Sequence, residues 1–394
     1  MKREDFPLLI NNPKLVYLDN ACTSLKPLKV IQAESRYYTD FGACAGRSSH
    51  RLGRKTNEEL DKCRETVARF VGAHADGLIW TKNATEALNL IAKSFGFSKK
   101  RKVVTTIMEH HAVLLPFMKL RDNGEIELEI LQCDNNGEVP IEKWESAIDD
   151  KTALVVTNSG NNTTGYRQNI KKIGKIAHDN GALICVDGAQ GVPHHKTNFK
   201  NEGIDFLCFS AHKMLGPTGI GAVVTRKELL ADMEHFIIGG GTVKTVRLDG
   251  IEHVENHTRF EAGIQDYAGI FGFAEACGYL EKIGMEKIED HEKKLRTHMV
   301  KALEDANAIR YGKDDENYSA LCSFNFKNAK PHDVALMLDK HEIAVRSGFF
   351  CAQPAIETLG AKEGAVRASC YIYNTEEDIK KFGDVLQKLK ALYA

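Results

Sequence analysis

Lys213 lies in a sequence that could make its amine reactive. The segment FSAHKMLGPTGIG, residues 209–221, places it after the apolar run IDFLCFS and before the glycine-rich run MLGPTGIGAVV. The alternative is a charged lysine on an exposed turn, but apolar flanks of this kind favour a pocket. A lysine that is partly desolvated, or that lies near other cations, is not permanently protonated and can form a Schiff base. Lys213 is therefore the first candidate catalytic residue.

Asp187 is a second candidate, because it ends the apolar run ALICVD and is followed by Gly188. A carboxylate at this position could be a helix cap or a metal ligand. It could also pair with a protonated ring nitrogen, and that pairing turns a pyridine ring into an electron sink. The third interpretation requires a carboxylate that stays ionised.

Two further strand ends carry residues that suit a flat, phosphorylated cofactor. In WTKNATEALNLIA, Thr85 precedes a predicted helix, and the N–H groups of the first turn and the helix dipole favour binding of a phosphate. The alternative is that Thr85 is only the N-cap of this helix. His111, in IMEHHAV, is either structural or stacks its imidazole on a heteroaromatic ring. A lysine, a carboxylate, a phosphate-type helix start and a flat side chain together match pyridoxal 5'-phosphate.

The elements that must position these residues can also be predicted. Between about residues 77 and 225, short β-rich runs alternate with helical patterns, which is typical of a mostly parallel sheet covered by helices. Ligands bind at the carboxyl edges of strands in such sheets, so the four strand ends should meet at one pocket. The predicted strands are LIWT, KVVTTI, IELEIL, ALVVT, ALICVD, DFLCFS and GAVVT.

Helical patterns cover residues 57–70 and 170–177, the second ending near Asn180-Gly181. From about residue 285 the pattern changes to a long charged helix, the strand-like run YSALCSFNF and the helix HDVALMLDKH. We therefore expect a second, smaller α+β domain. The predicted division is an N-terminal segment, 1–20, that contributes to the small domain, a large cofactor-binding domain, 21–280, and a small C-terminal domain, 281–394, that carries a catalytic cysteine loop.

Composition excludes several functions. The chain of 394 residues has 53 lysines and arginines against 54 aspartates and glutamates, so its net charge of -1 gives no general attraction for nucleic acid. Its ten cysteines form no C-x-x-C pair, which fits a reducing cytosol and predicts no metal site. No apolar stretch is long enough for a signal peptide or a membrane span. We expect a cytoplasmic protein that binds neither nucleic acid nor membranes.

The chain resembles the SUF-type (group II) cysteine desulfurases, which are fold-type I pyridoxal-phosphate enzymes of the class V aminotransferase group. This resemblance implies an α/β fold with a large, mostly parallel-sheet domain and a smaller α+β C-terminal domain. It also implies a homodimer. The matching stretches extend nearly from end to end and include YLDNACTS, NATEALN, MEHHA, VDGAQ, SAHKMLGPTGIG, GGGT, RFEAG, AVRSGFFCAQP and VRASCYIYNT.

The resemblance implies a role in cofactor binding for residues at each of these motifs. Lys213 would hold the cofactor covalently, Asp187 would face the ring nitrogen and His111 would stack on the ring. The phosphate contacts would come from the side chains of Thr85, Ser210 and His212 and from the backbone N–H of Ala84, which replaces a hydroxyl residue. Gln190 and Asn162 would hold the phenolic oxygen.

Two more positions imply the reaction. Arg367, in AVRASCYIYN, matches the arginine that binds the substrate carboxylate, with Asn162 beside it, and a guanidinium is the natural bidentate partner for that group. Cys351, in SGFFCAQP, matches the nucleophilic cysteine; a packed cysteine is the alternative. Besides Ala84, the sequence departs from the family pattern at Phe349 and Phe350, which replace two histidines, and at Ile264, which replaces a threonine. The stretch VTNSGNNTTGYR around Asn162 also differs from the usual form.

The expected activity is conversion of L-cysteine to L-alanine with a persulfide on Cys351, in which Lys213, Cys351 and His111 are catalytic. The sulfur would pass to an acceptor or scaffold protein of iron-sulfur cluster assembly. One alternative is a selenocysteine lyase, or another class V transaminase or lyase in which Cys351 is only structural. A sulfur-carrier or scaffold protein without catalysis is a third hypothesis.

Overall fold

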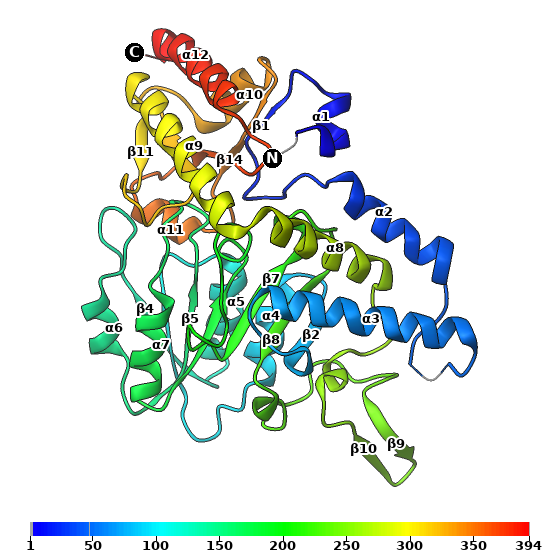
Figure 1. The fold of residues 1–394 in the computed structure, drawn as a ribbon. Coiled ribbons are helices and arrows are strands. Elements are labelled where there is room, and N and C mark those ends of the chain that lie inside the picture. The colour runs from blue at the N-terminus through cyan, green and yellow to red at the C-terminus, as the bar shows by residue number, and fades with distance from the viewer. Residues whose placement is uncertain (1–2, 47, 394) are drawn as a thin grey trace.

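A seven-stranded sheet forms the centre of the protein in a computed structural model, which describes residues 3–46 and 48–393 (Figure 1). The strand order is β2-β8-β7-β6-β5-β3-β4, and every neighbouring pair is parallel except the two that involve β8. All seven runs predicted as strands form this sheet. Their bounds are β2 Leu78–Thr81, β3 Lys102–Thr106, β4 Glu127–Leu131, β5 Thr152–Asn158, β6 Leu183–Asp187, β7 Phe206–Ser210 and β8 Gly221–Thr225.

Helices cover both faces of this sheet, which explains why its strands are nearly continuous apolar runs. Every residue of β2, β5, β7 and β8 is buried. Successive residues of each strand point to opposite faces, so Val155 and Ile184 belong to one core cluster and Leu154 and Cys185 to another. The first cluster packs against α3 (Arg51–Phe70), α6 (Ile141–Ala147), α7 (Ile170–Asp179) and α8 (Tyr267–Ile283), and the second against α4 (Ala84–Ser94) and α5 (His111–Asp122).

The two predicted helices agree with the structure in type and differ in their ends. The helix expected over 57–70 is the last part of α3, which begins six residues earlier at Arg51. The N-cap of α3 is His50, whose ring nitrogen accepts a hydrogen bond from the N–H of Gly53 at 3.1 Å. Histidine is an uncommon N-cap, so the sequence carried no ordinary start signal there.

The C-terminal part forms a second sheet and a second core. The long charged helix predicted after residue 285 is α9 (Met285–Asp305), and it packs with α10 (Pro331–Asp339) and α12 (Glu376–Tyr393) around Leu295, Val334 and Phe382. The antiparallel sheet has the order β11-β12-β15-β14. Its strands are β11 Ile309–Tyr311, β12 Leu321–Asn325, β15 Ala365–Ser369 and β14 Arg346–Gly348.

Residues near the N-terminus contact both the C-terminal part and helix α8, which covers the central sheet. Strand β1 (Val16–Tyr17) pairs in parallel with β13 (Ile343–Ala344), and Asp19 forms a bridge with Ser369. Short helices α1 (Pro7–Asn11) and α2 (Leu28–Arg36) lie on either side of β1 in sequence, and α2 packs on α8. The division into a 1–20 segment, a 21–280 domain and a 281–394 domain stays a prediction.

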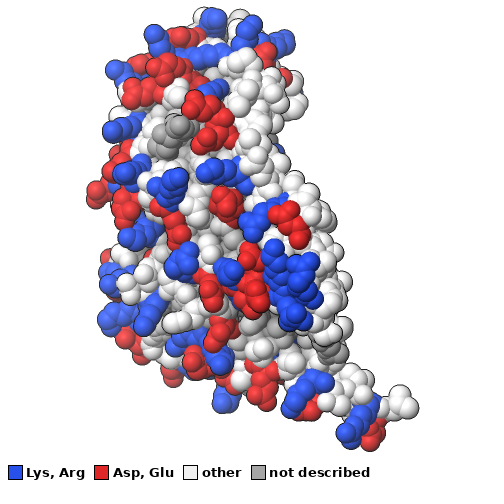
Figure 2. Space-filling view, turned by 45° about the vertical axis from the view of Figure 1, so that its right-hand side comes forward, with Lys and Arg blue, Asp and Glu red and all other residues white. Residues whose placement is uncertain are grey.

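Charged residues of both signs are mixed over the face drawn in Figure 2, with an uncharged margin on its right-hand side. The hairpin of β9 (Val243–Arg247) and β10 (Gly250–His253) projects at the lower right of Figures 1 and 2. Within residues 3–46 and 48–393, no helix has the length and apolar character needed to cross a bilayer.

Candidate functional site

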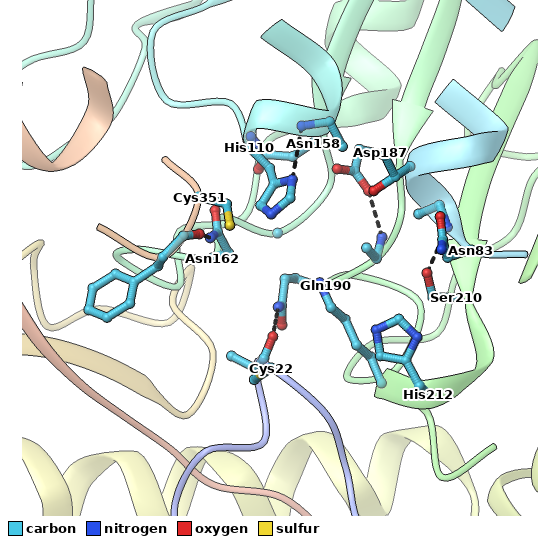
Figure 3. Close-up of a pocket in the computed structure, with 18 of the residues that line it drawn as sticks. Cys22, Asn83, His110, Asn158, Asn162, Asp187, Gln190, Ser210, His212 and Cys351 are labelled. Atoms are coloured by element: carbon cyan, nitrogen blue, oxygen red, sulfur yellow. Dashed lines mark hydrogen bonds between the residues drawn. The ribbon is translucent and has the colours of Figure 1, made fainter. Parts of the chain in front are cut away.

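Side chains from several strand ends meet in one cavity of about 240 Å³ (Figure 3). It lies at the carboxyl edge of the central sheet, where ligands of open α/β folds bind. The C-terminal part closes it with the segment that carries Cys351 and with strand β15. The predicted site residues that line it are Ala84, Thr85, Asn162, Asp187, Gln190, Ser210, His212, Lys213, Cys351 and Arg367.

Lys213 ends a short 3-10 turn that directly follows β7. The residue is partly buried and lines the cavity. Burial lowers the pKa of its amine, and the neighbouring charge of Arg367 acts in the same direction, while Asp187 opposes both. The amine therefore loses its proton more readily than an exposed lysine does, as a Schiff-base lysine requires.

Asp187 is buried at the end of β6, beside Asn158 at the end of β5. Burial raises the pKa of its carboxyl group, while the charge of Lys213 and a hydrogen bond from the N–H of Ala189 at 3.0 Å lower it. That bond occupies Oδ1, and no described residue donates a hydrogen bond to Oδ2. One carboxylate oxygen is therefore available to a ligand.

The N-terminus of α4 forms another wall of the cavity. Its N-cap is Asn83, whose Oδ1 accepts a hydrogen bond from the N–H of Glu86 at 2.9 Å, so the N-cap role considered for Thr85 is wrong. The N–H of Ala84 donates to Oγ of Ser210 at 2.7 Å. Ser210 thus links β7 to the first turn of α4, and Thr85 is the second helical residue, at the positive end of the helix dipole.

The two predicted amides contact backbone carbonyls around the cavity. Gln190 donates from Nε2 to the carbonyl oxygen of Ala21 at 2.7 Å, and Asn162 donates from Nδ2 to that of Phe350 at 2.8 Å. Each amide has a second N–H and a carbonyl oxygen. The amides therefore tie together segments from distant parts of the chain, and they retain groups that could bind a ligand.

The structure corrects the histidine assignment. His111, expected over the cofactor ring, does not line this cavity, whereas His110 does. His110 is the N-cap of α5, and its Nδ1 accepts a hydrogen bond from the N–H of Ala112 at 3.0 Å, which leaves the ring proton on Nε2. Burial and the charge of Lys213 lower the pKa of His110 to about 3, so its ring is neutral at pH 7.

Arg367 lies in β15 and is buried. Its Nη1 donates to the carbonyl oxygen of Asn162 at 2.9 Å, and its Nη2 lies 3.6 Å from the Asp19 carboxylate. The guanidinium carbon lies 4.7 Å from the centroid of the Phe350 ring. Burial lowers its pKa to about 10, so it stays charged at pH 7. Its Nε is buried without a hydrogen-bond partner among the described residues, and such a group favours an anionic ligand.

Cys351 is exposed on the segment between β14 and α11 (Gln353–Thr358). Phe350 and Cys351 both have left-handed backbone conformations, with φ of 53° and 55°. This conformation costs about 1–2 kcal/mol for a residue with a side chain. The contacts that hold it include the hydrogen bond from Asn162 to Phe350 and one from the N–H of His111 to the carbonyl oxygen of Cys351 at 2.7 Å.

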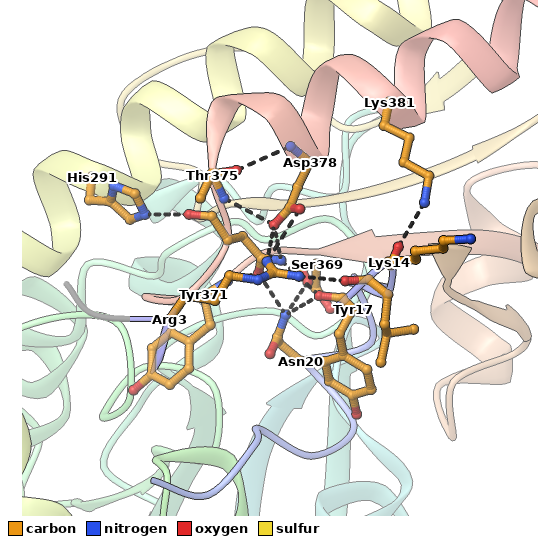
Figure 4. Close-up of polar contacts among 12 residues, drawn as sticks. Arg3, Lys14, Tyr17, Asn20, His291, Ser369, Tyr371, Thr375, Asp378 and Lys381 are labelled. Carbon is orange, nitrogen blue, oxygen red and sulfur yellow. Dashed lines mark hydrogen bonds and ion pairs between the residues drawn. The ribbon is translucent and has the colours of Figure 1, made fainter. Parts of the chain in front are cut away.

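Sequence reasoning missed several residues of the cavity. Ala21 and Cys22 belong to a turn that Asn20 anchors, because its Nδ2 donates to the carbonyl oxygen of Ser369 at 2.6 Å (Figure 4). The stretch YLDNACTS marked this turn without assigning a side chain in it. The sequence assigned no role to the other lining residues, although the matching motifs contain all of them except Asn158 and Gly160. These other residues are His110, Asn83, Ala112, Asn158, Gly160, Ala189, Arg346 and Phe350.

Comparison with known proteins gives the class of the protein. The sequence model of the family described as Aminotransferase class-V matches residues 16–382. A probable cysteine desulfurase of Methanothermobacter thermautotrophicus is 36% identical, over 99% of this chain and 98% of the relative. A probable cysteine desulfurase of Pyrococcus abyssi is 38% identical, over 98% of this chain and 96% of the relative.

A solved structure agrees with these relatives. The apo structure of a cysteine desulfurase from Thermococcus onnurineus NA1 superposes with a TM-score of 0.95 at 38% identity, covering 99% of this chain and 97% of that one. The chain therefore belongs to the class V aminotransferase family, in the group that contains these cysteine desulfurases. The predicted fold class is confirmed.

Proposed function

We propose that this protein is a pyridoxal-phosphate-dependent cysteine desulfurase that converts L-cysteine to L-alanine and carries the sulfur as a persulfide on Cys351. The observation that supports this most directly is the meeting of Lys213, Asp187, Arg367 and Cys351 in one cavity. The named relatives are cysteine desulfurases or probable ones, at 36% to 38% identity over almost the whole chain.

The residues of the cavity fit pyridoxal phosphate. The free oxygen of Asp187 suits a protonated ring nitrogen, and Gln190 and Asn162 suit the phenolic oxygen. The α4 N-terminus, with Thr85, Ser210 and His212 around it, suits the phosphate. We assign the stacking position to His110, because its neutral ring lines the cavity. When bound, the cofactor supplies an electron sink for the charge left at the substrate α-carbon.

Each side chain then has a defined task. Arg367 binds the substrate carboxylate through the charge and donors of its guanidinium, which lines the cavity. Lys213 takes up the α-proton at Nζ, since burial lowers the pKa of this amine. Asp187 keeps a proton on the ring nitrogen. Cys351 attacks the substrate sulfur as a thiolate, the form of cysteine that acts as a nucleophile. An S–S bond forms, the C–S bond of the substrate breaks, and the electron pair of that bond stays with the substrate carbon, which is protonated to give alanine.

We further propose membership of the SUF-type subgroup, a cytoplasmic location and delivery of the sulfur to an acceptor or scaffold protein of iron-sulfur cluster assembly. All ten cysteines are unpaired, which suits a reducing compartment. Because Cys351 is exposed, an acceptor protein could reach it without unfolding of the active-site loop.

A homodimer is also proposed. Exposed apolar side chains gather on α2, α3, the β9–β10 hairpin and the loops around it, on the right-hand side of Figure 1. Scattered apolar residues are normal on a surface, whereas a group of this kind favours an interface. Its members are Leu28, Ile31, Tyr38, Leu52, Ile237, Ile238, Val246, Leu248, Ile251 and Ile264.

Selenocysteine lyase is the second candidate, favoured by Phe349 and Phe350 beside the catalytic thiol. These aromatic rings provide an apolar wall where the related sequence pattern has histidines, and Phe350 packs against Arg367. Turnover of cysteine, selenocysteine and amino-acid/keto-acid pairs, measured with one preparation, separates a desulfurase from a lyase and from a transaminase.

The proposal is tested by incubating the holoenzyme with L-cysteine and measuring alanine and sulfide, with and without a reductant. We expect alanine in both cases and free sulfide chiefly with the reductant, because a persulfide must be reduced before it leaves. Borohydride trapping and peptide mapping should place the cofactor on Lys213. Purified protein without an absorbance band of the bound cofactor, and without alanine formation, would support a non-catalytic sulfur carrier instead.

A further inference from the structure

A second thiol lines the cavity that contains Cys351. Cys22 is partly buried in the turn after β1, and the cavity wall includes both sulfur-bearing residues. No other cysteine of the described residues lines it. Figure 3 shows the two on different chain segments around the same space. The site therefore offers two nucleophilic side chains, of which the reaction proposed above uses one.

The surroundings of Cys22 are cationic. Its N–H donates to the carbonyl oxygen of Asp19 at 3.1 Å, and the Asp19 carboxylate lies 3.1 Å from Nε of Arg346 and 3.6 Å from Nη2 of Arg367. Arg346, Arg367 and Lys213 line the cavity together with Cys22. Cationic groups of this kind stabilise negative charge on sulfur, in a thiolate or in a persulfide.

The turn that carries Cys22 is held firmly. The N–H of Ala21 donates to Oγ of Ser369 at 2.9 Å, and the carbonyl oxygen of Ala21 accepts from Gln190 at 2.7 Å. Oγ1 of Thr23 donates to the carbonyl oxygen of His212 at 3.1 Å. Cys22 therefore keeps its position, whereas Cys351 lies on a segment with two unfavourable φ angles that a change of conformation would relieve.

From these contacts we propose that Cys22 is a second sulfur-carrying residue, which takes the outer sulfur atom from the Cys351 persulfide inside the cavity. The inference rests on the proposed function, because the Cys351 persulfide must form first. Both cysteines line the cavity in which that persulfide would form.

The transfer needs no oxidant or reductant. The Cys22 thiolate attacks the outer sulfur of the Cys351 persulfide, a new S–S bond forms on Cys22, and the S–S bond on Cys351 breaks. Cys351 leaves as a thiolate, so one thiolate and one persulfide are present before and after the step. Cys351 is then free to take sulfur from a second L-cysteine, and each chain can hold two transferable sulfur atoms.

The test uses the holoenzyme with excess L-cysteine and neither acceptor nor reductant. Thiols and persulfides are alkylated, and peptide mass spectrometry locates each added sulfur. In the unchanged protein we expect added sulfur on both Cys22 and Cys351, which corresponds to about two transferable sulfur atoms per chain. In Cys22→Ser we expect about one transferable sulfur atom per chain. The matched control is Cys44→Ser, an exposed cysteine outside the cavity, which should keep both.

The outcomes separate this inference from the function on which it rests. Added sulfur on Cys351 alone, at full loading, overturns the role of Cys22 and leaves the desulfurase function intact. Added sulfur on neither cysteine overturns both. In Cys351→Ser we expect no added sulfur on Cys22. Added sulfur on Cys22 in this variant would show direct uptake from the substrate and would overturn the proposed transfer from Cys351. Mapping of the unchanged protein does not depend on the folding of any variant.

Discussion

The main-chain N–H of His111 donates a hydrogen bond to the carbonyl oxygen of Cys351 at 2.7 Å, and Nε2 of His111 accepts one from the N–H of Gln353 at 3.2 Å. The first residue of α5 therefore holds the segment that carries Cys351. The preceding residue, His110, lines the cavity that contains Lys213 and Asp187. Two adjacent histidines thus act on two different parts of the site.

This arrangement predicts different effects for the two histidines. His110→Ala should weaken binding of pyridoxal phosphate, because a flat wall of the cavity is lost. His111→Ala should retain the cofactor absorbance but slow persulfide formation by about tenfold or more, since misplacement of a reacting group by about 1 Å can cost 10²-fold. Cofactor titration and single-turnover persulfide assays measure these effects. The reverse pattern would restore His111 to the ring position.

Lys213→Ala should abolish covalent attachment of the cofactor and lower alanine formation by about 10²-fold or more, the usual contribution of a positioned acid or base. The physical reason is the loss of the only amine among the residues that line the cavity. Absorbance spectra and borohydride trapping provide the measurement. As a control, Lys82→Ala removes an exposed lysine that does not line the cavity. It should change neither the covalent attachment of the cofactor nor the rate of alanine formation.

Cys351→Ser should keep the cofactor absorbance and lose persulfide and alanine formation from L-cysteine, because a hydroxyl group is a poor nucleophile toward sulfur. Alanine release and peptide mapping of added sulfur measure the effect. Full turnover in this variant would show that Cys351 is structural and would favour a transaminase or lyase.

Arg367→Lys should raise KM for L-cysteine and lower kcat/KM by about 10- to 100-fold. A charge-assisted hydrogen bond contributes about 1.5–3 kcal/mol, and an ammonium group cannot reproduce the planar fork of the guanidinium. Steady-state kinetics measure the change. Arg69→Lys, an exposed position on α3, is the matched control and should leave KM unaltered. An unchanged KM in Arg367→Lys would remove this residue from substrate binding.

Glu109 predicts a pH dependence of stability. Burial raises its pKa from an ordinary value of 4.5 to about 7, although Asn158, Thr106 and Thr157 donate hydrogen bonds to its carboxylate. Between these two pH values the unfolded chain loses this proton before the folded chain does. The contribution of Glu109 to stability should therefore fall as pH rises from about 4.5 to 7, by on the order of 3 kcal/mol.

Urea unfolding of the cofactor-free protein at several pH values, compared with Glu109→Gln, measures this effect. The free energy of unfolding of the unchanged protein should fall relative to that of the variant as pH rises. If this difference stayed constant from pH 5 to 8, Glu109 would titrate alike in both states and the prediction would be wrong.

Local sequence was sufficient for most of the framework. Apolar, β-branched runs predicted most strands of the central sheet, because strands covered on both faces have no polar side to interrupt them. The edge strand β4 was also predicted, although Glu127 and Glu129 alternate there with apolar residues. Lys213 and Asp187 were found because each directly follows or ends such a run. The start of α3 was missed, since its N-cap is a histidine.

Tertiary structure alone decided which side chains share the cavity. His110 and His111 are equivalent in the sequence, and the extended backbone of the N-cap, with ψ of 151°, turns only the first toward the cavity. Cys22 lines the same cavity as Cys351, which is more than three hundred residues away in the sequence, because Asn20 and Ala21 bond to β15 at Ser369. Such contacts depend on packing between distant segments, and short-range residue patterns carry no information about it.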